Sequence, residues 1–424
     1  MNIAAKNSVG RQHIIEAIME RIELPSSAYE KAELRYEDIG DWMNQPNRSD
    51  LAKYHPHVAS QGSFRLGTAN KPINDDEYDL DLTVKLQRNL THASITQEHL
   101  KLMLHRDLES YRRFRSIQDP VESKRRCCRL NYQDNMSFHM DIVPSIPANK
   151  LTVDSVERML IESSSPAHLA RSVSKHAVSI TDNQRFPQYN IITDDWLLSN
   201  PEGYALWFEE QSKKAIILFD SKVLYEGQMA SVSELPNFRW KSPLQQCVQV
   251  LKHHRDIMYA VKNIDSKPIS VIITTLAARA YDGETNLALA LKNILSKMEL
   301  YINDVEPRVP NPVNLNEDFA DKWSTQEGVD LELEYNFRNW LKCAQEDFKL
   351  LDSTFDSKTL NEHVRTKLGV RVSSQTTDNQ IVNNNLLSKA TAVTSGLSST
   401  SALGVIGDSG VKNKEHEFYG DELD

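Results

Sequence analysis

The residues best suited to chemistry are two aspartates in an alternating segment, residues 78–86, with the sequence YDLDLTVKL. Side chains two apart on a strand share a face, so Asp79 and Asp81 would lie together opposite the leucines and valine. Paired carboxylates can bind a hard cation such as Mg²⁺. A solvated strand face produces the same spacing, and the pair alone leaves that alternative open.

A third aspartate lies in a second alternating segment, residues 137–143. Phe138, Met140 and Ile142 alternate there with His139, Asp141 and Val143. A lone carboxylate among apolar neighbours is costly to bury unless it is paired or binds a metal. If this strand lies beside the first, Asp141 joins Asp79 and Asp81 in one site for two metal ions.

A glycine–serine turn precedes the aspartate pair, in residues 61–68 (QGSFRLGT). Glycine lets backbone N–H groups approach a phosphate closely, and a serine hydroxyl adds a donor. Gly62 and Ser63 are therefore candidate phosphate contacts. Gln61 could reach a phosphate or the acceptor nucleotide, or it could cap the turn. Most such turns are purely structural, so this motif alone is weak.

Helical periodicity surrounds these segments. Residues 9–22 and 97–113 show it, and a helix over 26–43 would be capped by Ser26 or Ser27. Residues 127–132 and 137–143 predict a hairpin. Four later stretches predict a helical bundle: residues 243–261, 268–281, 287–300 and 329–351.

The pattern predicts an α+β protein with a mixed-sheet lobe and a C-terminal helical lobe. We expect domains over 1–235 and 236–371, and a flexible low-complexity tail over 372–424.

Composition narrows the class of protein. The net charge of −10 argues against gripping long nucleic acid, although residues 112–129 carry seven arginines and lysines. That run is either a binding patch or a solvated surface, and sparse aromatic residues favour the second. The four cysteines have no zinc-site spacing. With no apolar leader and no stretch long enough to span a membrane, we expect a soluble cytoplasmic protein.

The order of the motifs is more specific than any one of them. A Gly-Ser turn, an aspartate pair and a third strand aspartate sixty residues after Asp81 resemble the nucleotidyltransferase superfamily of DNA polymerase beta. Residues 62–86 and 141–144 are further similar to the bacterial cGAS/DncV-like nucleotidyltransferases (CD-NTases). The later segments that carry the same resemblance are residues 239–245, 251–256, 269–278, 311–312 and 317–323.

This resemblance implies a two-lobed polymerase-beta-like fold and an enzyme that condenses NTPs, ATP or GTP above all. Its product would be a cyclic di- or trinucleotide signal of CBASS anti-phage defence, which activates a downstream effector. Asp79, Asp81 and Asp141 would hold two Mg²⁺ ions, for which Mn²⁺ could substitute. Lys252 and, less directly, Ser270 would contact the donor triphosphate; from the residues alone, Lys252 reads as a surface lysine. Residues 311–323 would influence base choice.

The resemblance also bears on partners. A ubiquitin-ligase-like or peptide-binding protein could act on the tail, although its terminal Asp424 is not the small residue expected of a ubiquitin-like donor. Activation by DNA is not expected, because no zinc thumb is present. Two alternatives stay open: a linear nucleotidyltransferase acting on RNA or protein, and a scaffold that binds nucleotide without catalysis.

Overall fold

The computed structural model describes residues 14–73, 77–133, 137–215, 241–260, 264–349 and 357–369. By its internal contacts the chain divides into two units, residues 1–372 and 373–424. Everything described below belongs to the first unit, and the predicted tail lies outside the described residues. The boundary predicted near residue 235 also lies outside them and stays a prediction.

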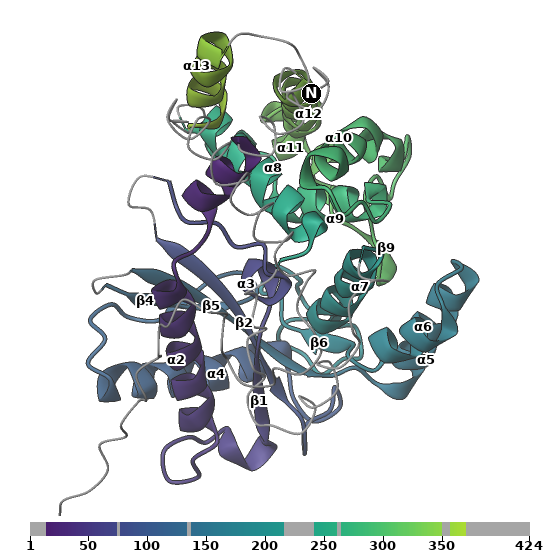
Figure 1. Cartoon of the computed structure of the whole chain (residues 1–424). Coiled ribbons are helices and arrows are strands. Elements are labelled where there is room, and N and C mark those ends of the chain that lie inside the picture. The colour runs from purple at the N-terminus through teal and green to yellow at the C-terminus, as the bar shows by residue number, and fades with distance from the viewer. Residues whose placement is uncertain are drawn as a thin grey trace, which may run out of the picture. The chain divides into compact units, whose positions relative to one another are not determined.

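A mixed sheet organises the first half of the chain (Figure 1). Its main path runs β1-β2-β5-β4-β3, and β6 and β7 extend it from β5. The pairing of β2 with β5 is parallel, and the other pairs are antiparallel. The strands are β1 (Pro56–Ser60), β2 (Tyr78–Leu86), β3 (Glu122–Ser123), β4 (Cys128–Tyr132), β5 (Phe138–Pro147), β6 (Val178–Ile180) and β7 (Leu197–Ser199).

The register of β2 and β5 fixes the positions of the aspartates. Asp81 is directly opposite Asp141, and Asp79 is opposite His139. Leu80 and Met140 are fully buried on the opposite face of the same strands. The alternation predicted for both segments is therefore confirmed, as is the hairpin of β4 and β5.

Helices from the N-terminal half cover the buried face of this sheet (Figure 1). They are α2 (Ser26–Met43) and α4 (Gln97–Phe114), and η1 (Ala52–Tyr54) precedes β1. The cap predicted for α2 is wrong: Pro25 is the N-cap, and no side chain caps the helix. Pro25 already has the extended backbone that a helix start requires, so Ser26 enters the first turn. Residues 14–22 are helical, as expected for the described part of 9–22.

A second apolar core joins residues 14–22 to the helices of the later chain. Ser242 caps α8 in a capping box with Gln245. The helix predicted over 329–351 is interrupted, because Glu332 between α11 and α12 has a left-handed φ of 52°. The helices are α5 (Lys150–Glu162), α6 (Ala167–Ser174), α7 (Pro201–Lys213), α8 (Pro243–Tyr259), η3 (Ile264–Ser266), α9 (Ser270–Ala280), α10 (Leu287–Lys297), η4 (Met298–Tyr301), η5 (Asp321–Ser324), α11 (Gln326–Asp330), α12 (Leu333–Lys349) and α13 (Ser357–Leu368).

A small hairpin interrupts this helical part. It consists of β8 (Pro310–Asn311) and β9 (Asn314–Asp318), which pair antiparallel. The Asp318 carboxylate accepts hydrogen bonds from the backbone N–H groups of Arg308, Val309 and Ala320. Three backbone donors on one carboxylate hold the base of the hairpin in a fixed shape.

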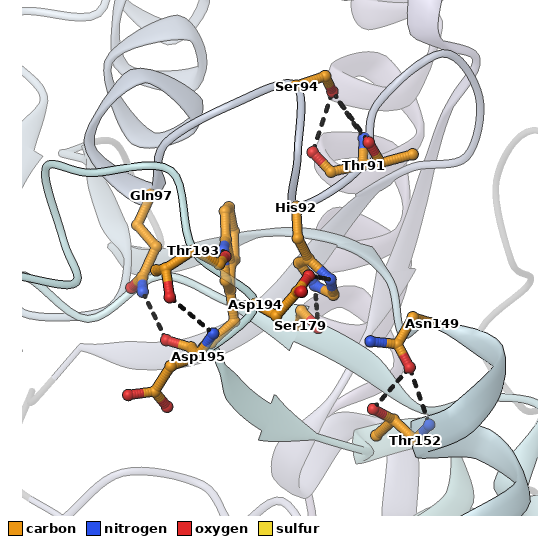
Figure 2. A network of polar contacts seen from close by, with 11 residues as sticks. Thr91, His92, Ser94, Gln97, Asn149, Thr152, Ser179, Thr193, Asp194 and Asp195 are labelled. Carbon is orange, nitrogen blue, oxygen red and sulfur yellow. Dashed lines mark hydrogen bonds and ion pairs between the residues drawn. The ribbon is translucent and has the colours of Figure 1, made fainter.

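A polar network holds the chain before α4 and the start of α4 against β6 and the segment that enters β7 (Figure 2). His92 Nε2 lies 2.8 Å from Ser179 Oγ on β6, and Gln97 Nε2 donates to the Asp195 carbonyl at 3.4 Å. These contacts connect the start of α4 to the chain that enters β7, directly before α7. Within the described part of the chain, no helix combines the length and the apolarity that crossing a membrane requires.

Candidate active site

Three carboxylates converge where β2 and β5 lie side by side. Oxygens of Asp79, Asp81 and Asp141 all lie within 4.8 Å of one another. The parallel register brings them together, because it places Asp141 opposite Asp81 and two residues from the level of Asp79. Asp79 is exposed, and the other two are half-buried. The convergence expected from the two alternating strands is thus present.

The cluster is electrostatically unfavourable without a cation. Burial, with Asp79 and Asp141 nearby, raises the pKa of Asp81 to about 8. Partial desolvation of its carboxylate among the neighbouring groups, together with the charge of Asp141, also raises the pKa of Asp79. Carboxylate oxygens this close are the ligands that hard divalent cations prefer, and a bound cation would relieve the repulsion. The donor set therefore fits divalent metal ions.

Gly62 packs against this cluster from the short helix α3 (Gly62–Leu66). Its φ is +61°, and a Cβ at this position would overlap the Asp81 carboxylate. Only glycine satisfies both requirements. The predicted turn is therefore the start of a helix. The Gln61 N–H donates to the Asp81 carbonyl at 2.8 Å, which ties this start to β2.

Lys252 is not a surface lysine. It lies on α8 with 7% of its surface exposed, and its Nζ donates to the Thr68 carbonyl at 2.9 Å. Burial, with Arg255 nearby, lowers its pKa to about 8. Ser270 begins α9, and its hydroxyl accepts a 2.9 Å hydrogen bond from Arg255 Nη1. Both predicted phosphate contacts are thus held by polar partners.

One cavity of about 840 Å³ connects most of the predicted residues. Its walls come from α3, β2, α7, α8, α9 and the β8–β9 hairpin. Two predicted site residues, Gln61 and Asp141, do not occur among the described residues that line it. The predicted residues in the lining are Gly62, Ser63, Asp79, Asp81, Lys252 and Ser270; the lining also includes Tyr204, Arg255, Lys267, Asn311, Glu317 and Phe319.

Arg129 is a site residue that the sequence reasoning did not identify. Its Nε and Nη2 donate to the two oxygens of Asp141 at 2.6 and 2.7 Å. Arg129 faces Asp141 directly across the β4–β5 hairpin. The hairpin register, counted back from its turn, is the sequence signal for this pair, although Arg129 also belongs to the basic run of residues 112–129.

Arg65 is a second residue that was missed. From α3 it donates to both oxygens of Glu202 at 3.0 and 2.7 Å, and to Glu209 at 2.6 Å. Both glutamates lie on α7. Because Arg65 follows Ser63 by two residues, this ion pair positions α3 against α7. A separation of more than 130 residues gives no signal of such a pair in one sequence.

The remaining polar candidates have structural partners. The seven basic residues of 112–129 all form ion pairs with acidic side chains, but not all of them fit the solvated-surface interpretation, because Arg129 pairs with Asp141 in the site and Arg125 and Arg126 pair with the buried Asp182. His139 contacts Asn131 and Glu77. His253 contacts the Leu368 carbonyl, and His254 contacts Asp347 and Trp340.

Comparison with known proteins agrees with this geometry. Residues 56–144 match the family described as "Cyclic GMP-AMP synthase DncV-like, nucleotidyltransferase domain", which spans the glycine–serine motif and all three aspartates. A c-di-GMP synthase from Roseivirga ehrenbergii is 28% identical over 330 residues, which cover 76% of each chain.

Two solved structures share the fold. The Bradyrhizobium diazoefficiens CD-NTase CdnG in complex with GTP aligns with a TM-score of 0.57 and 21% identity, over 89% of this chain and 99% of that one. CdnC of E. coli MS115-1, solved in a complex with HORMA-deltaN, aligns with a TM-score of 0.51 and 14% identity, over 85% of this chain and 96% of that one. The predicted two-lobed, polymerase-beta-like α+β fold is confirmed.

Proposed function

We propose that this chain, whose residues 56–144 form a DncV-like nucleotidyltransferase domain, condenses NTPs into a cyclic oligonucleotide. The observation that carries the proposal is the cluster of Asp79, Asp81 and Asp141, of which Asp79 and Asp81 line a cavity that Lys252 also lines. The similarity to a c-di-GMP synthase favours a cyclic dinucleotide over a trinucleotide. The product would serve as a second messenger for a downstream effector in anti-phage defence.

The three aspartates would hold two Mg²⁺ ions, and Mn²⁺ could replace them. When bound, such ions neutralise triphosphate charge and lower the pKa of an attacking ribose hydroxyl. Asp141 is the candidate to receive the proton from that hydroxyl. Both its oxygens already accept hydrogen bonds from Arg129, which orients the carboxylate and leaves each oxygen a second lone pair that can accept the proton.

The cations around the cavity would bind the triphosphate of the donor nucleotide. Lys252 supplies a buried charge, and Ser63 and Ser270 supply hydroxyl groups. Attack of the acceptor hydroxyl on the α-phosphate forms a phosphodiester bond and breaks the bond to pyrophosphate, which leaves. A second such step, in which the linear product supplies both the donor phosphate and the acceptor hydroxyl, closes the ring.

Incubation with single NTPs and NTP mixtures, with Mg²⁺ or Mn²⁺, tests the reaction. We expect a product that resists phosphatase and whose mass by mass spectrometry equals that of a closed ring. Asp81→Asn should abolish it, whereas Asp154→Asn, on the exposed face of α5, should not. A phosphatase-sensitive product would instead indicate a linear nucleotidyltransferase. No NTP consumption by the wild type under any of these conditions would contradict the proposal.

A peptide-binding regulatory partner is the other part of the proposal. The structural similarity to CdnC, which was solved with a HORMA protein, supports a search for one. Co-purification of the full chain with proteins encoded beside it would identify such a partner. A change in the rate of product formation upon its addition would establish regulation.

A further inference from the structure

The β8–β9 hairpin contributes a carboxylate to the nucleotide cavity that has no part in the proposed chemistry. Glu317 on β9 lines the cavity together with Asn311 and Phe319. It is half-buried, and burial raises its pKa, although Asn311 and Arg126 oppose this effect. The metal cluster consists of residues on β2 and β5, so Glu317 is a separate acidic group on a different element.

The orientation of Glu317 is fixed by its neighbours. Asn311 Nδ2 donates to Glu317 Oε2 at 2.7 Å, and Asn311 Oδ1 accepts from the Val313 N–H at 3.0 Å. The backbone donor dictates which end of the Asn311 amide faces Glu317. Since Asp318 anchors the base of the same hairpin, the carboxylate is held ready rather than recruited by a ligand.

The surroundings of Glu317 suit a planar ring. Phe319 and Tyr204 both line the cavity, and their rings meet edge to face with centroids 5.9 Å apart. The Tyr204 hydroxyl is already bonded to Thr275 Oγ1 at 2.8 Å, so this residue offers the cavity mainly its ring. This part of the wall thus combines aromatic surface with one fixed carboxylate, as a site for a nucleobase requires.

Resting on the proposed function, we propose that Glu317 selects guanine by accepting hydrogen bonds from the pairing edge of one bound nucleotide. Guanine presents two adjacent donors, N1–H and the N2 amino group, which match the two oxygens of a carboxylate. Adenine, cytosine and uracil each place an acceptor next to their donor, and this acceptor would face the negative charge. A fixed polar group left without its partner is what rejects the wrong base.

Equilibrium binding of GTP, ITP and ATP in Ca²⁺, which supports binding with little turnover, tests this assignment. ITP lacks only the N2 amino group. We expect the wild type to prefer GTP to ITP by about 10-fold and GTP to ATP by about 100-fold, as one bidentate base contact provides. Glu317→Gln should lose most of both preferences and bind ATP more tightly, because glutamine offers a donor beside an acceptor.

Glu327→Gln, on exposed α11, is the matched control and should retain the wild-type ratios. Equal binding of GTP and ITP by the wild type would overturn the assignment even if Glu317→Gln failed to fold. So would a folded Glu317→Gln variant with unchanged ratios. The binding measurement separates this inference from the proposed function. Selective GTP binding without a cyclic product overturns only the proposed function. A cyclic product without base selectivity overturns only the role of Glu317.

Discussion

At the scale of single residues, the aspartate cluster has opposing requirements. Asp79, Asp81 and Asp141 must be close together to share cations, yet their closeness disfavours ionisation while no cation is bound. Arg129 offsets part of this repulsion at Asp141. The cluster should therefore lower the stability of the metal-free protein at alkaline pH and make that stability depend on metal.

This electrostatic conflict predicts a pH dependence. The pKa of Asp81 in the folded protein is raised to about 8 from 3.8, so its contribution to stability is complete below the lower value and is lost as the pH rises through 8. In EDTA, the Tm of the wild type should fall more steeply between pH 6 and 9 than that of Asp81→Asn, and Mg²⁺ should reduce the difference. Differential scanning fluorimetry measures this, and Asp154→Asn should behave as the wild type. Parallel slopes for Asp81→Asn and the wild type would refute the prediction.

Gly62 carries a second prediction at this scale. In Gly62→Ala, the new Cβ would overlap the Asp81 carboxylate at a left-handed φ, so the carboxylate must move. We expect about a 100-fold loss of product formation, which is typical of a misplacement near 1 Å, and a smaller rise in Tm upon addition of Mg²⁺. Gly67→Ala is the control, because Gly67 has a similar φ of +65° but follows the end of α3. If both variants lost activity equally, backbone strain rather than the contact with Asp81 would be the cause.

At the scale of elements, the site depends on contacts between helices that are distant in the chain. Helix α3 presents Ser63 to the cavity and is tied to α7 by Arg65. Helix α7 in turn presents Tyr204, and α8 reaches the chain after α3 through the hydrogen bond from Lys252 to Thr68. The proposed phosphate contacts Ser63 and Lys252 and the aromatic ring of Tyr204 are therefore positioned by the same set of helix contacts.

Arg65→Met should destabilise the protein by about 3 kcal/mol, because it leaves two partly buried glutamates without their cation. Arg65 is 13% exposed, compared with 32% for Glu202. Urea denaturation gives the loss in free energy of unfolding for Arg65→Met, Glu202→Gln and the double variant. The loss in the double variant should be clearly smaller than the sum of the two single losses. Arg365→Met, which breaks an exposed pair with Glu362, should leave the free energy of unfolding close to that of the wild type. Equal costs at the two sites would mean that the α3–α7 contact does not depend on this ion pair.

At the scale of the whole chain, every residue assigned to the site lies within the unit of residues 1–372. Two apolar cores support it, one beneath the sheet and one among the helices. The cavity is lined by elements belonging to both. Nucleotide chemistry should therefore be complete in this unit.

Deletion of residues 373–424 should leave the rate of product formation of the purified protein within about twofold of the wild type. The reason is that the described residues already form both apolar cores and line the cavity. Product formation by mass spectrometry measures this, with the full chain as the control. A loss of more than tenfold would mean that the tail contributes directly to the site.

Local patterns in the sequence were sufficient to predict several strands and helices of the protein. The alternation around Asp79 and around Asp141 predicted both strands and the face that carries the carboxylates, because burial on one side of a strand repeats every two residues. The helices predicted over residues 243–261 and 268–281 likewise correspond to α8 and α9 of the structure. The motif order then indicated a nucleotidyltransferase site.

Which distant residues meet at this site depends on the packing of the folded chain. Three features depend on how the strands and helices pack: the burial of Lys252, the ion pair of Arg129 with Asp141 and the ion pair of Arg65 with α7. Such packing produces no periodic pattern in a single sequence. The placement of Glu317 in the nucleotide cavity has the same origin, since a hairpin more than 230 residues beyond Asp81 must fold against α7 to bring it there. Local burial repeats along a chain, whereas contacts between distant elements exist only once the chain has folded.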